Sequence, residues 1–146
     1  MVSWWSLLRF LHVLSAAVWV GGQLTLSALL LPVLRRRLPE DLRTALTSSI
    51  GRRFGLYTLV LFVPVQVGTG IGLAIEHGVT WHTLVQPGYG RTLAAKLAVF
   101  VVVMVLSGLH GWAHSTGRTT HARALALGSL IGSCVIVLLA TALVSS

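Results

Sequence analysis

Acidic residues, sulfur-containing residues and charged residues in general are scarce in this chain. Glu40, Asp41 and Glu76 are the only acids among 146 residues, so a catalytic triad and a pair of catalytic carboxylates are excluded. Cys134 is the only cysteine, which excludes a disulfide framework and a dithiol redox pair. Charged residues make up 10% of the chain and apolar residues 55%, a balance that excludes a water-soluble globular domain.

Long apolar runs are what the sequence has instead. Four of them reach or exceed the roughly 20 residues that an α-helix needs to cross a bilayer. They are Trp4–Leu34, Phe54–Ile75, Thr92–Trp112 and Ala122–Val144. The connections between successive runs are short, which favours antiparallel neighbours. The sequence therefore predicts an all-α fold, an integral membrane four-helix bundle with up-down-up-down topology that forms a single domain over residues 1–146.

The basic residues, which give the chain a formal charge of +8, are predicted to lie mostly on one side of the membrane. They cluster between the first and second runs and between the third and fourth: Arg35, Arg36, Arg37, Arg43, Arg52, Arg53, Arg118 and Arg123. The connection from His77 to Gly90 has neither lysine nor arginine. Because cytoplasmic loops carry the excess of Lys and Arg, both termini are predicted to lie outside, in a multi-pass protein of the bacterial inner membrane. We expect membrane lipids with anionic headgroups, and not nucleic acid, to be the partners of this charge.

The first run holds the most distinctive pattern in the chain. At about 100° per residue, its polar and aromatic residues share one stripe: Trp5, His12, Ala16, Trp19 and Gln23, with Arg9 at the edge. A histidine on the only polar stripe of a membrane helix is expected to face the protein interior. His12 is therefore the first candidate for a ligand.

Depth along the helices sorts the remaining polar residues into two groups. With a rise of about 1.5 Å per residue, His12 and Lys96 of the outer group lie at a similar height in the membrane. The other members of the outer group lie at or near the outer rim: His77, Glu76, Arg91 and Arg9. The inner group holds His110, His114 and His121. On the third run, Lys96, Val103, Ser107, His110 and His114 again form one stripe.

These groups are compatible with haem b held inside the bundle. Haem needs an inward-facing histidine, space beside small residues, and basic groups near the rim for its propionates. His12 supplies the ligand, Trp19 a wall, and Arg9, Arg91 or Lys96 the basic groups. Further cofactor contacts are predicted at His77, His110 and His114, and direct metal bonds at His12, His77 or His110. A second haem at the inner group would add electron transfer to a redox partner in the membrane.

Copper handling and purely structural hydrogen bonding are the alternatives. Imidazole suits copper, but a Cu(I) pathway uses methionine or cysteine ligands, and the chain has two methionines and one cysteine. Buried histidines also hydrogen-bond between helices without any cofactor. The residues alone leave these three interpretations open.

Two further segments carry structural predictions. Pro39, Glu40 and Asp41 look like the start of a short helix resting on the membrane interface, since proline and acids suit a first helical turn. Gly128 and Gly132 form a close-packing face on the fourth run. That face is predicted to pack inside the bundle or to join two copies as a homodimer.

Several motifs resemble a known family. The stretch from Phe10–His12 to Trp19–Gly22 resembles the opening helix of CopD-type copper-resistance membrane proteins. Thr69-Gly70 and the segment Tyr89–Leu97 are similar to later signatures of the same family. The resemblance covers about the first three helices. It implies a four-helix membrane unit linked to copper uptake or tolerance.

A second resemblance involves haem. His12, Lys96 and His110-Gly111 are similar to residues of the HemJ-type protoporphyrinogen oxidases, small helical membrane proteins that use haem. This likeness implies a haem-type pocket near these residues. It also adds protoporphyrinogen oxidation as a further alternative function.

Overall fold

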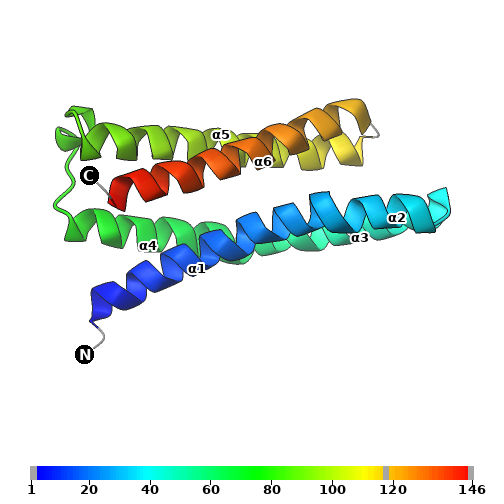
Figure 1. The fold of residues 1–146 in the computed structure, drawn as a ribbon, viewed down its shortest axis with the longest axis horizontal. Helices are drawn as coiled ribbons and strands as arrows, with labels where there is room; N and C mark the ends of the chain where they lie inside the picture. The colour runs from blue at the N-terminus through cyan, green and yellow to red at the C-terminus, as the bar shows by residue number, and fades with distance from the viewer. Residues whose placement is uncertain (1–2, 117–118, 145–146) are drawn as a thin grey trace. The chain divides into compact units, whose positions relative to one another are not determined.

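The computed structural model describes residues 3–116 and 119–144, and the secondary structure in those ranges is entirely helical (Figure 1). The chain divides into two compact units, Met1–His77 and Gly78–Ser146, which we call unit 1 and unit 2 and describe separately. Unit 1 contains α1 (Trp4–Leu24), η1 (Thr25–Leu30), α2 (Leu31–Arg37), α3 (Glu40–Tyr57), η2 (Thr58–Phe62) and α4 (Val63–Glu76). Unit 2 contains η3 (Thr83–Val85), α5 (Tyr89–Ser115) and α6 (Thr119–Val144). The single domain expected over residues 1–146 stays a prediction.

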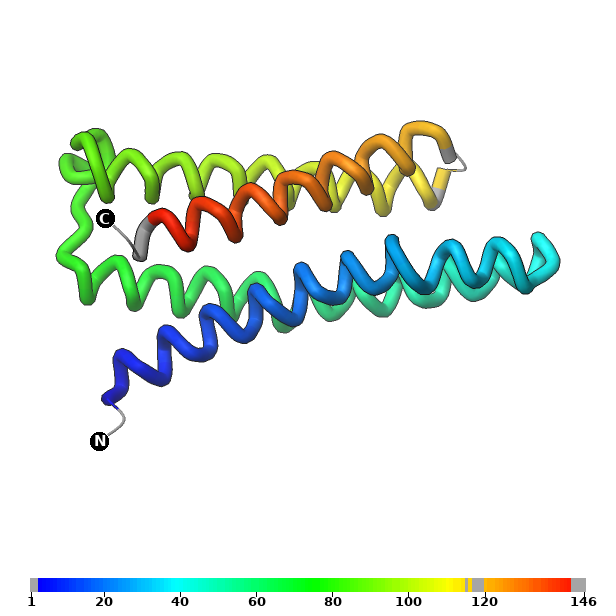
Figure 2. The backbone as a smooth tube through the Cα atoms, viewed as in Figure 1, coloured from blue at the N-terminus to red at the C-terminus, as the bar shows by residue number. Residues whose placement is uncertain are grey.

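Unit 1 is a hairpin of two long helical rods (Figure 2). The hydroxyl of Ser3 caps the first rod by accepting a hydrogen bond from the Ser6 backbone N–H. That rod runs without interruption to Arg37. It ends at Leu38, whose backbone is extended with φ −119° and ψ 142°, because the ring of Pro39 disfavours helical geometry in the preceding residue.

The second rod corrects one prediction of the sequence. A helix does begin at Glu40, but it continues as one rod to Glu76, so the expected separate helix on the membrane interface is wrong. Glu40 and Asp41 occupy the first turn, where acids stabilise the positive end of the helix. Arg52 and Arg53 are part of this continuous helix. A charged side chain removes no backbone hydrogen bond, so it does not end a helix.

Each rod of unit 1 contains one π-helical stretch, η1 in the first and η2 in the second. A proline follows each stretch directly, Pro32 at the start of α2 and Pro64 at the start of α4. Proline has no N–H, and its ring crowds the carbonyl four residues earlier, which belongs to Ala28 in η1 and to Val60 in η2. The wider π turn accommodates that crowding without breaking the helix.

Unit 2 is a hairpin of α5 and α6, and small residues bring the two helices close together. Val103 is fully buried, and a Cβ added at Gly132 would overlap its side chain. The hydroxyls of Ser107 and Ser129 are hydrogen-bonded at 2.8 Å across the same contact. The face that carries Gly132 therefore packs against α5 within unit 2. The homodimer expected through that face stays a prediction.

Among the residues that the structure describes, four helices are long and apolar enough to cross a membrane: Trp4–Arg37, Glu40–Glu76, Tyr89–His114 and Thr120–Ala142. Their outward faces expose large apolar side chains such as Leu59, Leu138 and Ile75. Such faces suit contact with lipid tails rather than with water. The predicted four membrane helices are confirmed in length and composition, whereas the up-down-up-down bundle and the outward termini stay predictions.

Candidate functional site

The candidate site lies in unit 1, where α1 packs against α4, and His12 is at its centre. The His12 ring is half-buried, and its Nδ1 lies 2.8 Å from the hydroxyl oxygen of Thr69 on α4. Thr69 is 6% exposed and Gln66, one turn earlier on the same helix face, is 8% exposed. The stripe predicted from helical periodicity therefore does turn His12 toward a neighbouring helix.

The hydrogen bonds of Thr69 determine the tautomer of His12. The Thr69 hydroxyl lies 2.5 Å from the carbonyl oxygen of Val65, a separation that two oxygens tolerate only with a hydrogen between them. Thr69 therefore donates to Val65, and its lone pair accepts from the Nδ1–H of His12. The proton of the neutral ring is on Nδ1, and the lone pair is on Nε2.

Gln66 and Ser15 complete this network, which we call the His12 network (His12, Ser15, Val65, Gln66 and Thr69). The side-chain amide N–H of Gln66 donates to His12 Nε2 at 3.0 Å. The Ser15 hydroxyl donates to Gln66 Oε1 at 2.6 Å, and lies 3.1 Å from the His12 carbonyl oxygen. Every member is uncharged, so the network suits a membrane interior, where an isolated charge is costly.

Trp19 repeats the same arrangement two turns further along α1. Its indole N–H donates to the Thr58 hydroxyl at 3.0 Å, and Thr58 in turn donates to the Phe54 carbonyl at 2.8 Å. The ring of Trp19 is 2% exposed and stacks on Phe62, with ring centroids 4.5 Å apart and planes 7° from parallel. Trp19 and Phe62 form an aromatic layer two turns from His12, on the side of the His12 network toward the C-terminal end of α1.

Glycines on α4 allow α1 to approach the network closely. A Cβ added at Gly70 would lie 3.4 Å from His12 Cε1, and one at Gly72 would lie 3.3 Å from Leu8 Cδ1. Side chains larger than a methyl group would displace the imidazole. Gly70 and Gly72 thus lie within the helix α4 and let α1 approach it closely.

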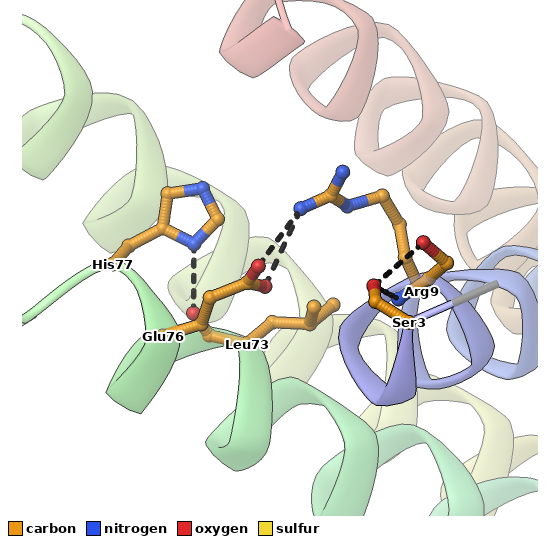
Figure 3. Close-up of polar contacts among 6 residues, drawn as sticks. Ser3, Arg9, Leu73, Glu76 and His77 are labelled. Carbon is orange, nitrogen blue, oxygen red and sulfur yellow. Dashed lines mark hydrogen bonds and ion pairs between the residues drawn. The ribbon is translucent and has the colours of Figure 1, made fainter. Parts of the chain in front are cut away.

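An ion pair links α1 and α4 at the end of unit 1 that holds the N-terminus (Figure 3). The guanidinium of Arg9 lies 3.3 and 3.4 Å from the two carboxylate oxygens of Glu76. Arg9 is one turn from His12 on α1, and its side chain is 58% exposed. His77 is adjacent to Glu76, but its Nδ1–H donates to the Leu73 carbonyl at 2.8 Å, so its ring is held against its own helix.

The remaining predicted residues lie in unit 2. His110 Nδ1–H donates to the Ala122 carbonyl at 2.7 Å, and its ring centroid is 6.4 Å from that of His114. Lys96 is half-buried on α5, and Arg91 is exposed in its first turn. Within residues 3–116 and 119–144, no group of three or more His, Cys, Asp or Glu side chains lies close enough together to hold a metal ion. The structure thus pairs some predicted residues but does not collect them around one ion.

The partners of His12 and Trp19 are what the sequence pattern missed. In the sequence, Thr69 stood out only in the pair Thr69-Gly70, and Ser15, Thr58 and Phe62 did not stand out at all. Spacing held one usable signal, because Gln66 and Thr69 are three residues apart and share a helix face. That signal did not say which face of α1 they would meet.

Comparison with known proteins found one clear relative. A protein of Aquifex aeolicus (strain VF5), described as uncharacterized, is 33% identical over 139 residues, which cover 91% of this chain and 90% of that protein. No protein-family model matches the chain, and no solved structure does. The resemblance to the CopD-type and HemJ-type families therefore stays a prediction.

Proposed function

The chain belongs to the same family as the Aquifex aeolicus protein, and we propose that it is a membrane protein that binds haem b through His12. Haem b bound there would supply one-electron redox chemistry, which suits a role in electron transfer within the membrane. Copper handling and protoporphyrinogen oxidation, the alternatives, have no observation in unit 1 that favours them over haem.

One observation carries the proposal, namely the proton position on His12. Histidines that bind metals through Nε2 almost always donate their Nδ1–H to a neighbouring oxygen, which fixes both the tautomer and the ring orientation. Thr69 supplies that oxygen at 2.8 Å and is itself fixed by its bond to Val65. His12 thus has the tautomer and the support of an axial ligand.

The shortage of further ligands favours haem over a bare metal ion. A copper or zinc ion held without water is bound by three or four side-chain ligands, and no such group exists in the parts of the chain that the structure describes. Haem supplies four nitrogens of its own and needs as few as one protein ligand. His12, which provides the one imidazole of the His12 network, fits that requirement.

Gln66 is the residue that ligation would displace. Its amide donates to His12 Nε2 at 3.0 Å, so this nitrogen is covered while no ligand is bound. The amide is neutral, and its oxygen remains anchored by Ser15 at 2.6 Å. Rotation of one side chain therefore uncovers the ligand nitrogen, at the loss of one hydrogen bond worth about 1 kcal/mol.

Arg9 is the group in unit 1 best placed to bind a propionate. Its guanidinium lies one turn outward of His12 and already holds a carboxylate, that of Glu76, with both oxygens within 3.4 Å. A haem propionate is also a carboxylate, so it could bind the Arg9 guanidinium through both of its oxygens in the same way.

The orientation we propose follows from the arginine distribution. Arg35, Arg36 and Arg37 end the first rod and are all exposed, and Arg52 and Arg53 are exposed on the second. The positive-inside rule puts this end of the hairpin in the cytoplasm and His12 in the outer half of a bacterial inner membrane. Both chain ends would then face outward.

The test is haem content. The full chain is purified in detergent with haem supplied during expression, and bound haem is counted from its visible spectrum per mole of protein. We expect the wild-type protein to carry haem and His12→Ala to lose it, while His77→Ala, which removes an exposed histidine of the same unit, keeps it. Full haem content in His12→Ala at equal protein yield would overturn the ligand assignment.

A further inference from the structure

Unit 2 carries two imidazoles that the site at His12 does not use. His110 and His114 are four residues apart on α5, so their side chains lie on one face, one turn apart. Their ring centroids are 6.4 Å apart and the ring planes are 56° from parallel. Two imidazoles at this spacing can direct one nitrogen each at a shared point between them.

His110 is already oriented as a ligand. Its Nδ1 lies 2.7 Å from the Ala122 carbonyl oxygen, and a carbonyl only accepts, so the ring proton is on Nδ1. The lone pair is therefore on Nε2, which is the arrangement that supports metal-bound histidines. The ring is half-buried, whereas His114 in the last turn of α5 is exposed and has more freedom to adjust.

The composition of unit 2 selects the class of ion. Residues 78–146 contain no Asp or Glu, so the carboxylate oxygens that Mg²⁺ and Ca²⁺ require are missing. Neutral imidazole nitrogens suit Cu²⁺, Ni²⁺ and Zn²⁺. We propose that His110 and His114 chelate one such late transition-metal ion. The pair belongs to no larger ligand group in residues 3–116 and 119–144, so water completes the coordination and the ion is exchangeable.

The full chain, purified in detergent without a polyhistidine tag, is titrated with Cu²⁺ by calorimetry, and the bound ion is examined by electron paramagnetic resonance. We expect one site per chain with two nitrogen ligands, and at least a tenfold loss of affinity in His110→Ala and in His114→Ala. His82→Ala is the control, because His82 is also an exposed histidine of unit 2 and its ring bonds to Gln86, but no second imidazole lies one turn away.

The inference fails if His114→Ala binds Cu²⁺ as tightly as the wild-type protein, or if His82→Ala loses as much affinity. His114 is exposed, so its replacement leaves the helix packing intact, and circular dichroism checks this. The outcome is independent of haem content, because that measurement depends on His12 in unit 1. Either proposal can therefore fail while the other holds.

Discussion

Thr69→Val isolates the contribution of the hydrogen bond that orients His12. The change keeps the shape of the side chain and removes only the hydroxyl that accepts the Nδ1–H at 2.8 Å. Without a bound ligand, the His12 ring can respond to the loss of the Thr69 hydroxyl by changing its tautomer. The Gln66 amide flips so that its oxygen accepts from Nε2–H, and Nδ1, now without a proton, needs no acceptor. With iron on Nε2, the proton must stay on Nδ1 and lacks a partner.

The penalty therefore falls on the ligand-bound protein. An unsatisfied buried N–H costs about 1–3 kcal/mol, and loss of such a supporting bond lowers metal affinity by about 10–100-fold. The two ranges agree, since a tenfold change in affinity corresponds to about 1.4 kcal/mol. We expect a haem dissociation constant about 10–100 times higher in Thr69→Val, and an affinity restored largely by Thr69→Ser.

The assay is a haem titration of haem-free protein, followed by the visible absorption band. Thr58→Val is the matched control, because Thr58 lies on the same rod, donates to the carbonyl four residues earlier, and accepts the indole N–H of Trp19. It should lower stability without weakening haem binding more than a few-fold. If Thr69→Val binds haem as tightly as the wild-type protein, or if Thr58→Val weakens binding equally, the reasoning about His12 is wrong.

Two other predictions concern packing and orientation. Gly132→Ala places a methyl group against Val103, a stiff, fully buried β-branched side chain, and should destabilise unit 2 by about 1–3 kcal/mol. In Gly108→Ala the new methyl group meets nothing within 4 Å, and the change should stabilise unit 2 by up to about 1 kcal/mol. Thermal unfolding in detergent compares the two variants, and equal melting temperatures would contradict the packing argument. Cysteine introduced at Thr80 should react with an impermeant reagent added to intact cells, and cysteine at Thr44 should not; the reverse labelling would invert the proposed orientation.

Periodicity predicted the faces of the helices well. The stripe with His12 and Trp19 does face the second rod, and Val103 does face α6, because side-chain direction in a uniform helix depends only on residue number. Length and hydropathy likewise predicted four membrane helices. Side-chain direction, length and hydropathy are properties of each helix by itself, so they can be predicted from the sequence alone.

Pairing between helices is what the sequence could not supply. Thr69 and Thr58 both accept an N–H from α1, yet the π-helical stretch η2 begins at Thr58 and changes the angle per residue before Thr69 is reached. A fixed 100° step therefore misplaces residues on one side of it relative to the other. The wrong helix boundary had another cause, since the apolar run that starts at Phe54 suggested a new helix although one rod continues from Glu40 to Glu76.

The most direct test of His12 as the haem ligand is chemical rescue. His12→Gly removes the imidazole and leaves a space beside Thr69 and Gly70 that a free imidazole can enter. We expect this variant to lack the haem spectrum and to regain it when millimolar imidazole and haem are added together, with Thr69 accepting the N–H of the added ring. A variant that keeps its haem without imidazole, or that never regains it, would contradict the assignment.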